Sequence, residues 1–229
     1  VVDLEQAHFA SIIAGVSVRR GLPPRAATIA LATAFQESGI RTLDFGDRDS
    51  VGIFQQRPSQ GWGTKQQLTD PYYATGKFYD VLVKIKNWET GDINDVAQKV
   101  QFSGHPEAYR EHEADARLLA SALTGQTPAG LSCLDRSGTP GDTKGLRRSL
   151  QRTFGELDDS AEESVVTIRA GGSRQAWAYA HFAVANAQSY GVTTVKIGNR
   201  AWQTQDFNLP DWQEVTPKLK NARVEITVR

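Results

Sequence analysis

Apolar residues recur at helical spacing through the first 124 residues of the chain. The pattern predicts helices over about 4–20, 25–37, 72–86, 93–100 and 106–124. Pro23 and Pro24 stand where a helix can begin, and Asp70-Pro71 is a second such start. Residues 38–70 are rich in Gly, Asp, Ser and Gln, which predicts irregular or short-element structure. The first part of the chain is therefore expected to be all-α.

The pattern changes after residue 145. A short amphipathic helix is predicted over 146–154 and a longer one over 173–190, with strands over 164–168, 192–197 and 222–228. Between the two parts, residues 125–145 are dense in Gly, Pro, Ser and Thr. We therefore predict an α+β protein of two domains: an all-α domain (1–124), a linker (125–145) and a small α/β sandwich (146–229).

Composition narrows the range of partners. The 229 residues include 26 basic and 26 acidic side chains, and no run of Lys and Arg exceeds two, so we expect no nucleic-acid partner. Cys133 is the sole cysteine and the four histidines lack metal-ligand spacing, so we expect neither a disulfide nor a zinc site and predict no cofactor. No segment approaches the roughly 18 apolar residues of a membrane span, which predicts no membrane contact by this chain. Methionine is absent even at position 1, so we expect that the original start has been removed, as a signal peptide, as an anchor or by a cloning choice.

One carboxyl group stands out as candidate chemistry. Glu37 ends an alanine-rich helix, and the glycine-containing segment Ser50–Gln56 follows within twenty residues. A carboxyl group in a partly apolar cleft can stay protonated near neutral pH and donate to the leaving oxygen of a glycosidic bond. A glutamate at a helix end is otherwise typical of a solvated surface, so Glu37 alone is a weak signal.

Longer motifs strengthen that interpretation. Glu37-Ser38 is followed by Gly52-Ile53-Phe54-Gln55, within the run 44–63 that begins Asp-Phe-Gly-Asp-Arg-Asp-Ser, and later by Ala-Gln-Lys-Val-Gln at 97–101 leading to 106–109. With these motifs residues 1–124 resemble the lysozyme-like superfamily, in particular lytic transglycosylases, goose-type lysozymes and the lysozyme-like domains of exported actinobacterial wall proteins. The resemblance implies an enzyme that cuts peptidoglycan glycan strands at the β-1,4 bond between N-acetylmuramic acid and N-acetylglucosamine. It also implies an extracellular or cell-envelope location.

The resemblance also implies roles for individual residues. Glu37 would be the general acid and later the base, while Gln55 and the backbone around Ser50 would line the sugar groove. The resemblance to goose-type enzymes favours Asp47 as a second carboxylate. Asp44 and Asp49 lie near it in the sequence and are candidates for the same role. Hydrolysis would need that second group, whereas transglycosylation would not, because the sugar's own 6-hydroxyl closes on the anomeric carbon. The sequence leaves the choice between the two reactions open.

One family motif is absent. Lytic transglycosylases carry Ala-Tyr-Asn late in the domain, and this chain has no such triplet. The matching region lies within 101–109, where Tyr109 is the candidate aromatic that positions Glu37 or the sugar, with Phe102 behind it. Tyr109 as simple core packing is an equal alternative. The missing motif also motivates a second hypothesis, a lysozyme-like module that binds peptidoglycan or acts as a scaffold without turnover.

The second domain gives less specific signals. Trp177, Trp202 and Trp212 suggest either a carbohydrate-stacking surface or, from the helical spacing around Trp177, core packing. The order of elements resembles domains that follow actinobacterial wall hydrolases, some of them similar to D-alanyl-D-alanine carboxypeptidases. The metal-binding histidines of those enzymes are missing from the last strand, 222–228. We therefore expect a non-catalytic binding or positioning domain.

Overall fold

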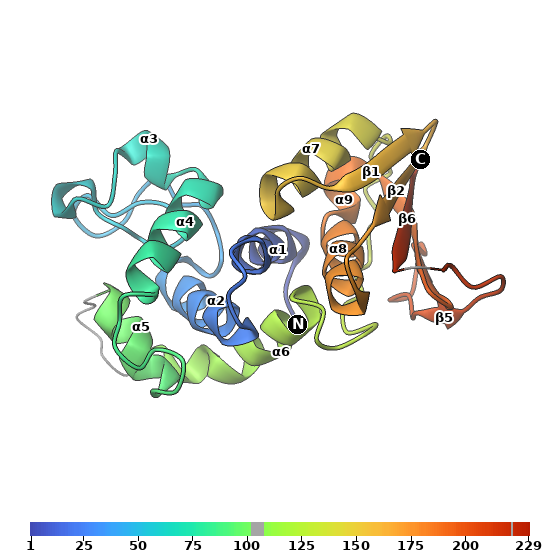
Figure 1. Cartoon of the computed structure of the whole chain (residues 1–229). Helices are drawn as coiled ribbons and strands as arrows, with labels where there is room; N and C mark the ends of the chain where they lie inside the picture. The colour runs from blue at the N-terminus through green and yellow to red at the C-terminus, as the bar shows by residue number, and fades with distance from the viewer. Residues whose placement is uncertain (102–107, 221) are drawn as a thin grey trace. The chain divides into compact units, whose positions relative to one another are not determined.

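The computed structural model describes residues 1–101, 108–220 and 222–229 and has a mixed α+β fold (Figure 1). The first half contains helices and two 3₁₀ helices: α1 (Leu4–Arg19), α2 (Pro24–Ser38), η1 (Pro58–Gln60), α3 (Lys65–Leu68), α4 (Pro71–Leu82), α5 (Ile93–Gln101), η2 (Arg110–His112) and α6 (Glu113–Leu123). The second half adds three helices: α7 (Thr143–Phe154), α8 (Ser173–Ala185) and α9 (Ala187–Tyr190). Its strands are β1 (Asp158–Glu162), β2 (Val165–Arg169), β3 (Val192–Ile197), β4 (Arg200–Gln203), β5 (Gln213–Glu214) and β6 (Arg223–Val228).

The chain divides into two compact units. One contains 12–120, and the other contains 1–11 together with 121–229. The division near residue 120 lies close to the predicted domain boundary at 124, but residues 1–11 group with the second half of the chain. Helix α1 therefore contributes its first turns to one unit and the remainder to the other.

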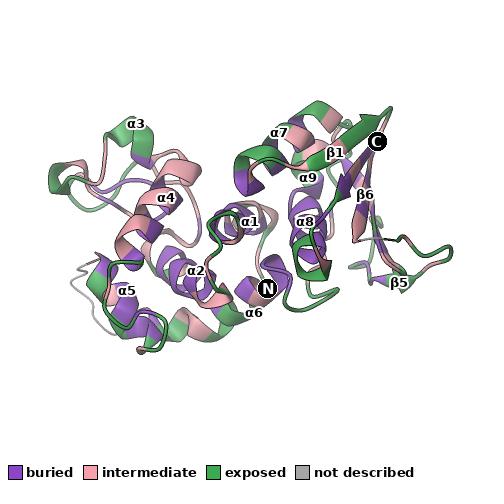
Figure 2. Cartoon of the chain, in the orientation of Figure 1, coloured by how far each residue is buried: buried purple, intermediate pink, exposed green. Residues whose placement is uncertain are grey.

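The unit formed by 12–120 is built around α2. The helix starts at Pro24, where the missing N–H costs nothing, and a continuous run of its residues from 26 to 34 is buried. Figure 2 shows the middle of this helix in the buried colour. Alanines fill much of that run, so neighbouring helices can approach closely, and α2 contacts both α4 and α5. Glu37 is thus carried by the most enclosed element of this unit.

The other unit is a two-layer arrangement of an antiparallel sheet and helices. The strand order is β1-β2-β6-β3-β4-β5, and every neighbouring pair is antiparallel. Alternate residues of β2 and β6 are buried, namely Val166, Ile168, Val224 and Ile226, so one face of the sheet is apolar. Helix α8 lies against β3 and β6 on that face, and α7 contacts β2 (Figure 1).

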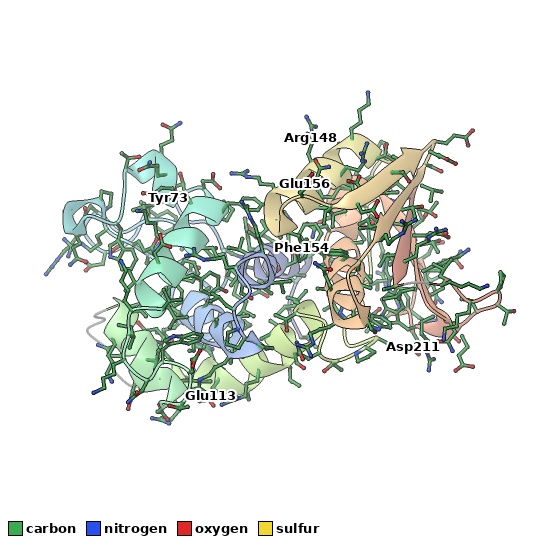
Figure 3. All side chains as sticks on the ribbon, in the orientation of Figure 1. Tyr73, Glu113, Arg148, Phe154, Glu156 and Asp211 are labelled. Atoms are coloured by element: carbon green, nitrogen blue, oxygen red, sulfur yellow. The ribbon has the colours of Figure 1, made fainter. Side chains whose placement is uncertain are left out.

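Aromatic side chains fill the space under α8. Trp177, Trp202 and Trp212 are at most 8% exposed, so all three belong to the core. Phe154, labelled in Figure 3 at the end of α7, packs edge-on against Tyr179 at 4.8 Å between ring centroids. The core alternative for the tryptophans is therefore the one that the structure supports.

A buried asparagine joins α1 to the second half of the chain. Asn186, between α8 and α9, is fully buried; its Nδ2 donates to Ser11 Oγ at 2.9 Å, and His8 Nδ1 donates to its Oδ1. Asn186 Nδ2 also donates to the carbonyl of Phe182 at 2.7 Å. These bonds explain why 1–11 group with 121–229.

Most predicted elements occur with shifted ends. The predicted helix 173–190 is divided at Asn186, the predicted helix 72–86 ends at Leu82, and the helix expected over 106–124 begins at Glu113, with its predicted start outside the described residues. Strands β2, β3 and β6 match the three predicted strands. Strands β1, β4 and β5 were not predicted: β1 reads Asp-Asp-Ser-Ala-Glu and has no apolar alternation, and β5 has only two residues.

The segment predicted as a linker packs into its unit. Cys133 is buried and its Sγ donates to the carbonyl of Val184, while Asp135 is buried and lies 3.5 Å from Arg229. Among the described residues, no helix has both the length and the apolar character to cross a bilayer.

Candidate functional site

Glu37 lies in the last turn of α2. Gly39 ends the helix in the left-handed conformation, at φ 64° and ψ 33°, and its N–H bonds back to the carbonyls of Ala34 and Phe35. Glu37 is half-buried, so its carboxyl group is partly shielded but not enclosed. Because the C-terminal end of a helix carries partial negative charge, the helix does not favour an ionised carboxylate there. Other groups must therefore orient this side chain.

Tyr109 supplies such an orienting contact. Its hydroxyl donates to Glu37 Oε1 at 2.6 Å, across 72 residues of sequence. Tyr109 is fully buried, so the packed ring holds the hydroxyl in a fixed place. A short hydrogen bond from a fixed donor restricts the rotamers available to the Glu37 carboxyl group. Tyr109 is therefore a core residue that also contacts Glu37, so the alternatives of core packing and of positioning Glu37 do not exclude each other.

The residues after Tyr109 are attached to the same helix end. His112 Nε2 lies 3.1 Å from Gln36 Oε1, and the His112 ring stacks on Phe35 with 5.5 Å between centroids. Arg110 pairs with Asp92 at 3.1 Å, at the start of α5. The segment 109–112 is therefore held on both sides, and His112 takes part in holding it.

Ser38 joins the helix end to the glycine-containing turn. Its Oγ donates to the carbonyl of Ile53 at 2.7 Å and accepts from the N–H of Arg41 at 3.1 Å. Gln101 Nε2 donates to the carbonyl of Phe54 at 2.6 Å, so the same turn is also attached to α5. Sequence reasoning included Ser38 in a motif but gave neither Ser38 nor Gln101 a role.

The turn itself is a small closed loop. Val51 and Gln56 exchange two backbone hydrogen bonds of 3.1 Å, and the N–H of Gln55 bonds to the carbonyl of Gly52. Ile53 and Phe54 at its tip are fully buried, and Phe54 stacks on Phe78 at 4.6 Å. The apolar pair thus anchors the turn in the core.

Two glycines allow close backbone approach here. Gly52 has φ +80°, and a Cβ on it would lie 2.0 Å from the carbonyl oxygen of Leu68. A Cβ on Gly46 would lie 1.9 Å from Gln55 Oε1. Gln55 Nε2 donates to the carbonyls of Phe45 and Gly52, at 3.3 and 3.2 Å. The predicted substrate-lining residue Gln55 is therefore half-buried and bound to its own loop.

Ser50 and Asp47 belong to one turn. The N–H of Ser50 bonds to the carbonyl of Asp47 at 3.0 Å, and Ser50 is buried. The Asp47 side chain is 93% exposed and lies 3.9 Å from Arg48. Asp44 is exposed as well. These two aspartates are therefore solvated side chains on the surface of the loop.

Asp49 differs from its two neighbours. Its oxygens accept from Arg57 Nε at 2.8 Å, from the N–H of Ser59 at 2.7 Å and from Ser59 Oγ at 3.0 Å. The Arg57 hydrogen bond, followed by the Ser59 backbone bond, holds the pKa of Asp49 well below its usual range. Asp49 thus joins its loop to residues 57–59 through these hydrogen bonds.

The contacts bring together some of the predicted site residues. Glu37 and Tyr109 are directly hydrogen-bonded, and Gln55 lies in the turn that Ser38 attaches to the same helix end. Phe102 lies outside the described residues. Among the described residues, no group of three or more His, Cys, Asp or Glu side chains could hold a metal ion.

Comparison with known proteins gives no further assignment. No protein-family model matches this chain, and no curated protein matches it. The chemistry is therefore argued from the contacts above.

Proposed function

We propose that this protein cleaves peptidoglycan glycan strands at the β-1,4 bond between N-acetylmuramic acid and N-acetylglucosamine, with Glu37 as general acid and then base. The observation that carries the proposal is the hydrogen bond from the buried Tyr109 hydroxyl to Glu37 Oε1. General acid catalysis needs a carboxyl group held in one orientation and still accessible to the substrate. Glu37 is half-buried and has a fixed donor on one oxygen, which fits that requirement.

The surrounding contacts support the same role. Ser38 attaches the helix end to the Gly52–Gln55 turn, and His112 attaches the 109–112 segment to the residues just before Glu37. A carboxyl group with its neighbours fixed before the substrate arrives needs less reorganisation in the transition state. These ties, together with the family resemblance of 1–124, support a lysozyme-like domain acting on a glycan in the cell envelope.

The proposed reaction begins with proton donation from Glu37 to the glycosidic oxygen, so that the bond to the anomeric carbon breaks through an oxocarbenium-like transition state. The resulting Glu37 carboxylate then accepts a proton from the attacking group. If that group is the 6-hydroxyl of the same muramic acid, a 1,6-anhydro end forms and no second carboxylate is needed. If it is water, a reducing end forms, and Asp47 is the proposed second carboxylate.

The deciding experiment is digestion of purified peptidoglycan by the wild-type protein and by Glu37→Gln. The matched control is Glu89→Gln, the same change at an exposed glutamate. We expect soluble muropeptides from the wild type and the control and none from Glu37→Gln. Mass spectrometry of the products then assigns the reaction: 1,6-anhydromuramyl ends indicate a lytic transglycosylase, and reducing ends indicate a hydrolase.

Release of muropeptides by Glu37→Gln at the wild-type rate would refute the proposal. If the wild-type protein pellets with insoluble peptidoglycan and releases nothing, the chain is instead a binding or scaffold module. That alternative rests on the missing Ala-Tyr-Asn motif.

A further inference from the structure

The unit formed by 1–11 and 121–229 contains a cavity that the proposed glycan chemistry does not use. Its volume is about 650 Å³, and it is lined by the start of α8, the turn between β3 and β4 and the segment before β6. A volume in this range suits a small-molecule ligand. The residues that bear on its chemistry are Ser173, Trp177, Ile197, Asn199, Lys218 and Lys220.

The charged groups on its wall have one sign. Lys218 and Lys220 both line the cavity, and none of its described lining residues is acidic. Neither lysine has an ion-pair partner among the described residues. Two unpaired ammonium groups beside one cavity make its potential positive, which favours a negatively charged occupant.

Backbone groups add to that potential. Ser173 is the first residue of α8, a helix of 13 residues, and no side chain caps this helix at Gly172. The N-terminal end of a helix presents unpaired N–H groups and partial positive charge. The N–H of Leu219 bonds to the carbonyl of Gly198 at 2.9 Å, which attaches the lysine-bearing segment to the β3–β4 turn. The segment 218–220, which carries both lysines, is therefore attached to the β3–β4 turn through Leu219.

The remaining lining is apolar and distinguishes between kinds of anion. Trp177 and Ile197 are 7% and 5% exposed and, with Ala176, give the cavity an apolar part. A phosphate or sulfate ion would leave that part unused, whereas a carboxylate attached to a small apolar body would cover it. Asn199, on the β3–β4 turn, supplies both a donor and an acceptor for an amide group.

We propose that this cavity binds a small organic carboxylate with an apolar body, of which the C-terminal residue of a short peptide is the best example. The carboxylate meets Lys218, Lys220 and the start of α8, and the apolar side chain meets Trp177 and Ile197. The inference rests on this cavity alone and not on cleavage by Glu37.

The test is a titration of the full-length protein, followed by NMR, with N-acetyl-alanyl-alanine, with its C-terminal amide and with inorganic phosphate. We expect the free acid to shift the signals of the Trp177 indole N–H and of the amides of 173–176, with a Kd of about 1 mM for a ligand of this size. The amide and phosphate should bind at least about tenfold more weakly. Added salt should weaken the binding of the acid, because it screens exposed charges.

Lys218→Gln/Lys220→Gln should weaken binding of the acid about tenfold. The matched control Lys144→Gln/Lys196→Gln removes the same charge from two exposed lysines that do not line the cavity, and should leave the Kd unchanged. No shifts with the acid, equal binding of the amide, tighter binding of phosphate, or an equal loss in the control would each overturn the proposal. None of these results bears on Glu37, because no glycan is present.

Discussion

Replacing Tyr109 by Phe removes one atom from the candidate site. The ring of Tyr109 is fully buried and would keep its packing, so the change is confined to the hydroxyl that donates to Glu37 Oε1 at 2.6 Å. Glu37 becomes a carboxylate as it donates its proton, and a hydrogen bond to a charged group contributes about 1.5–3 kcal/mol. Glu37 is half-buried, so water can replace part of that bond, and we take the lower end of the range. About 1.5 kcal/mol corresponds to about a tenfold fall in rate.

We expect this loss in kcat, with KM almost unchanged, because the hydroxyl positions the acid and does not bind the sugar. The assay is the initial rate of muropeptide release over a range of peptidoglycan concentrations, together with thermal unfolding. Tyr79→Phe is the matched control: Tyr79 is also fully buried, lies in the same unit, and donates to the backbone carbonyl of Ile13 at 2.9 Å. Each variant should lose about 1 kcal/mol of stability, or about 2–4 °C in Tm. If Tyr109→Phe loses the same stability as Tyr79→Phe but keeps full kcat, the positioning argument is refuted.

Three further predictions concern stability. Gly52→Ala should lower Tm well beyond the effect of Gly21→Ala. Both glycines have positive φ, but of the two only Gly52 would place a new Cβ against a backbone oxygen, at 2.0 Å. Equal losses of Tm in the two variants would contradict the close approach at Gly52. Asp49→Asn should lower Tm at pH 7 and progressively less below about pH 4. The pKa of Asp49 is lower in the folded than in the unfolded state, so its carboxylate adds stability above the unfolded pKa, and this stability is lost on acidification. A loss of Tm that does not depend on pH would contradict this reasoning. Burial lowers the pKa of His181 to about 4, so the folded state should lose up to about 3 kcal/mol of stability as pH falls from about 6.5 to 4. His181→Gln should flatten that part of the Tm profile, and an unchanged slope in the variant would contradict the assignment to His181.

Periodicity in the sequence was enough to predict elements that bury a regular apolar face. Helix α4 and strand β6 were found because their buried positions recur every three to four and every two residues. Helices α2 and α8 are buried over continuous runs, and they were found because large apolar side chains recur at helical spacing in the sequence. Strand β1 was missed because its residues are polar and its place in the sheet depends on a partner strand and on Arg147, which pairs with Asp159 at 2.5 Å. The break at Asn186 was missed for a similar reason, since its amide bonds to Ser11, 175 residues away.

The candidate site shows the same limit. Glu37 could be proposed from the sequence because a local motif surrounds it, and Tyr109 because it is the tyrosine in the region where the family motif is absent. The contact between them spans 72 residues and depends on how the 109–112 segment lies against α2, which no local pattern specifies. The role of Gln55 was harder to foresee, because its amide bonds to carbonyls of its own loop.

The attachment of residues 1–11 to Asn186 has a consequence for how this chain is made. Residues 12–120 are contiguous in sequence and emerge from the ribosome one after another, so that unit can begin to fold during synthesis. Residues 1–11 emerge before it, yet the asparagine that binds Ser11 and His8 follows 175 and 178 residues later. The second unit therefore cannot close before residue 186 has been made, and its formation is expected to be the slower of the two events because it joins distant parts of the chain.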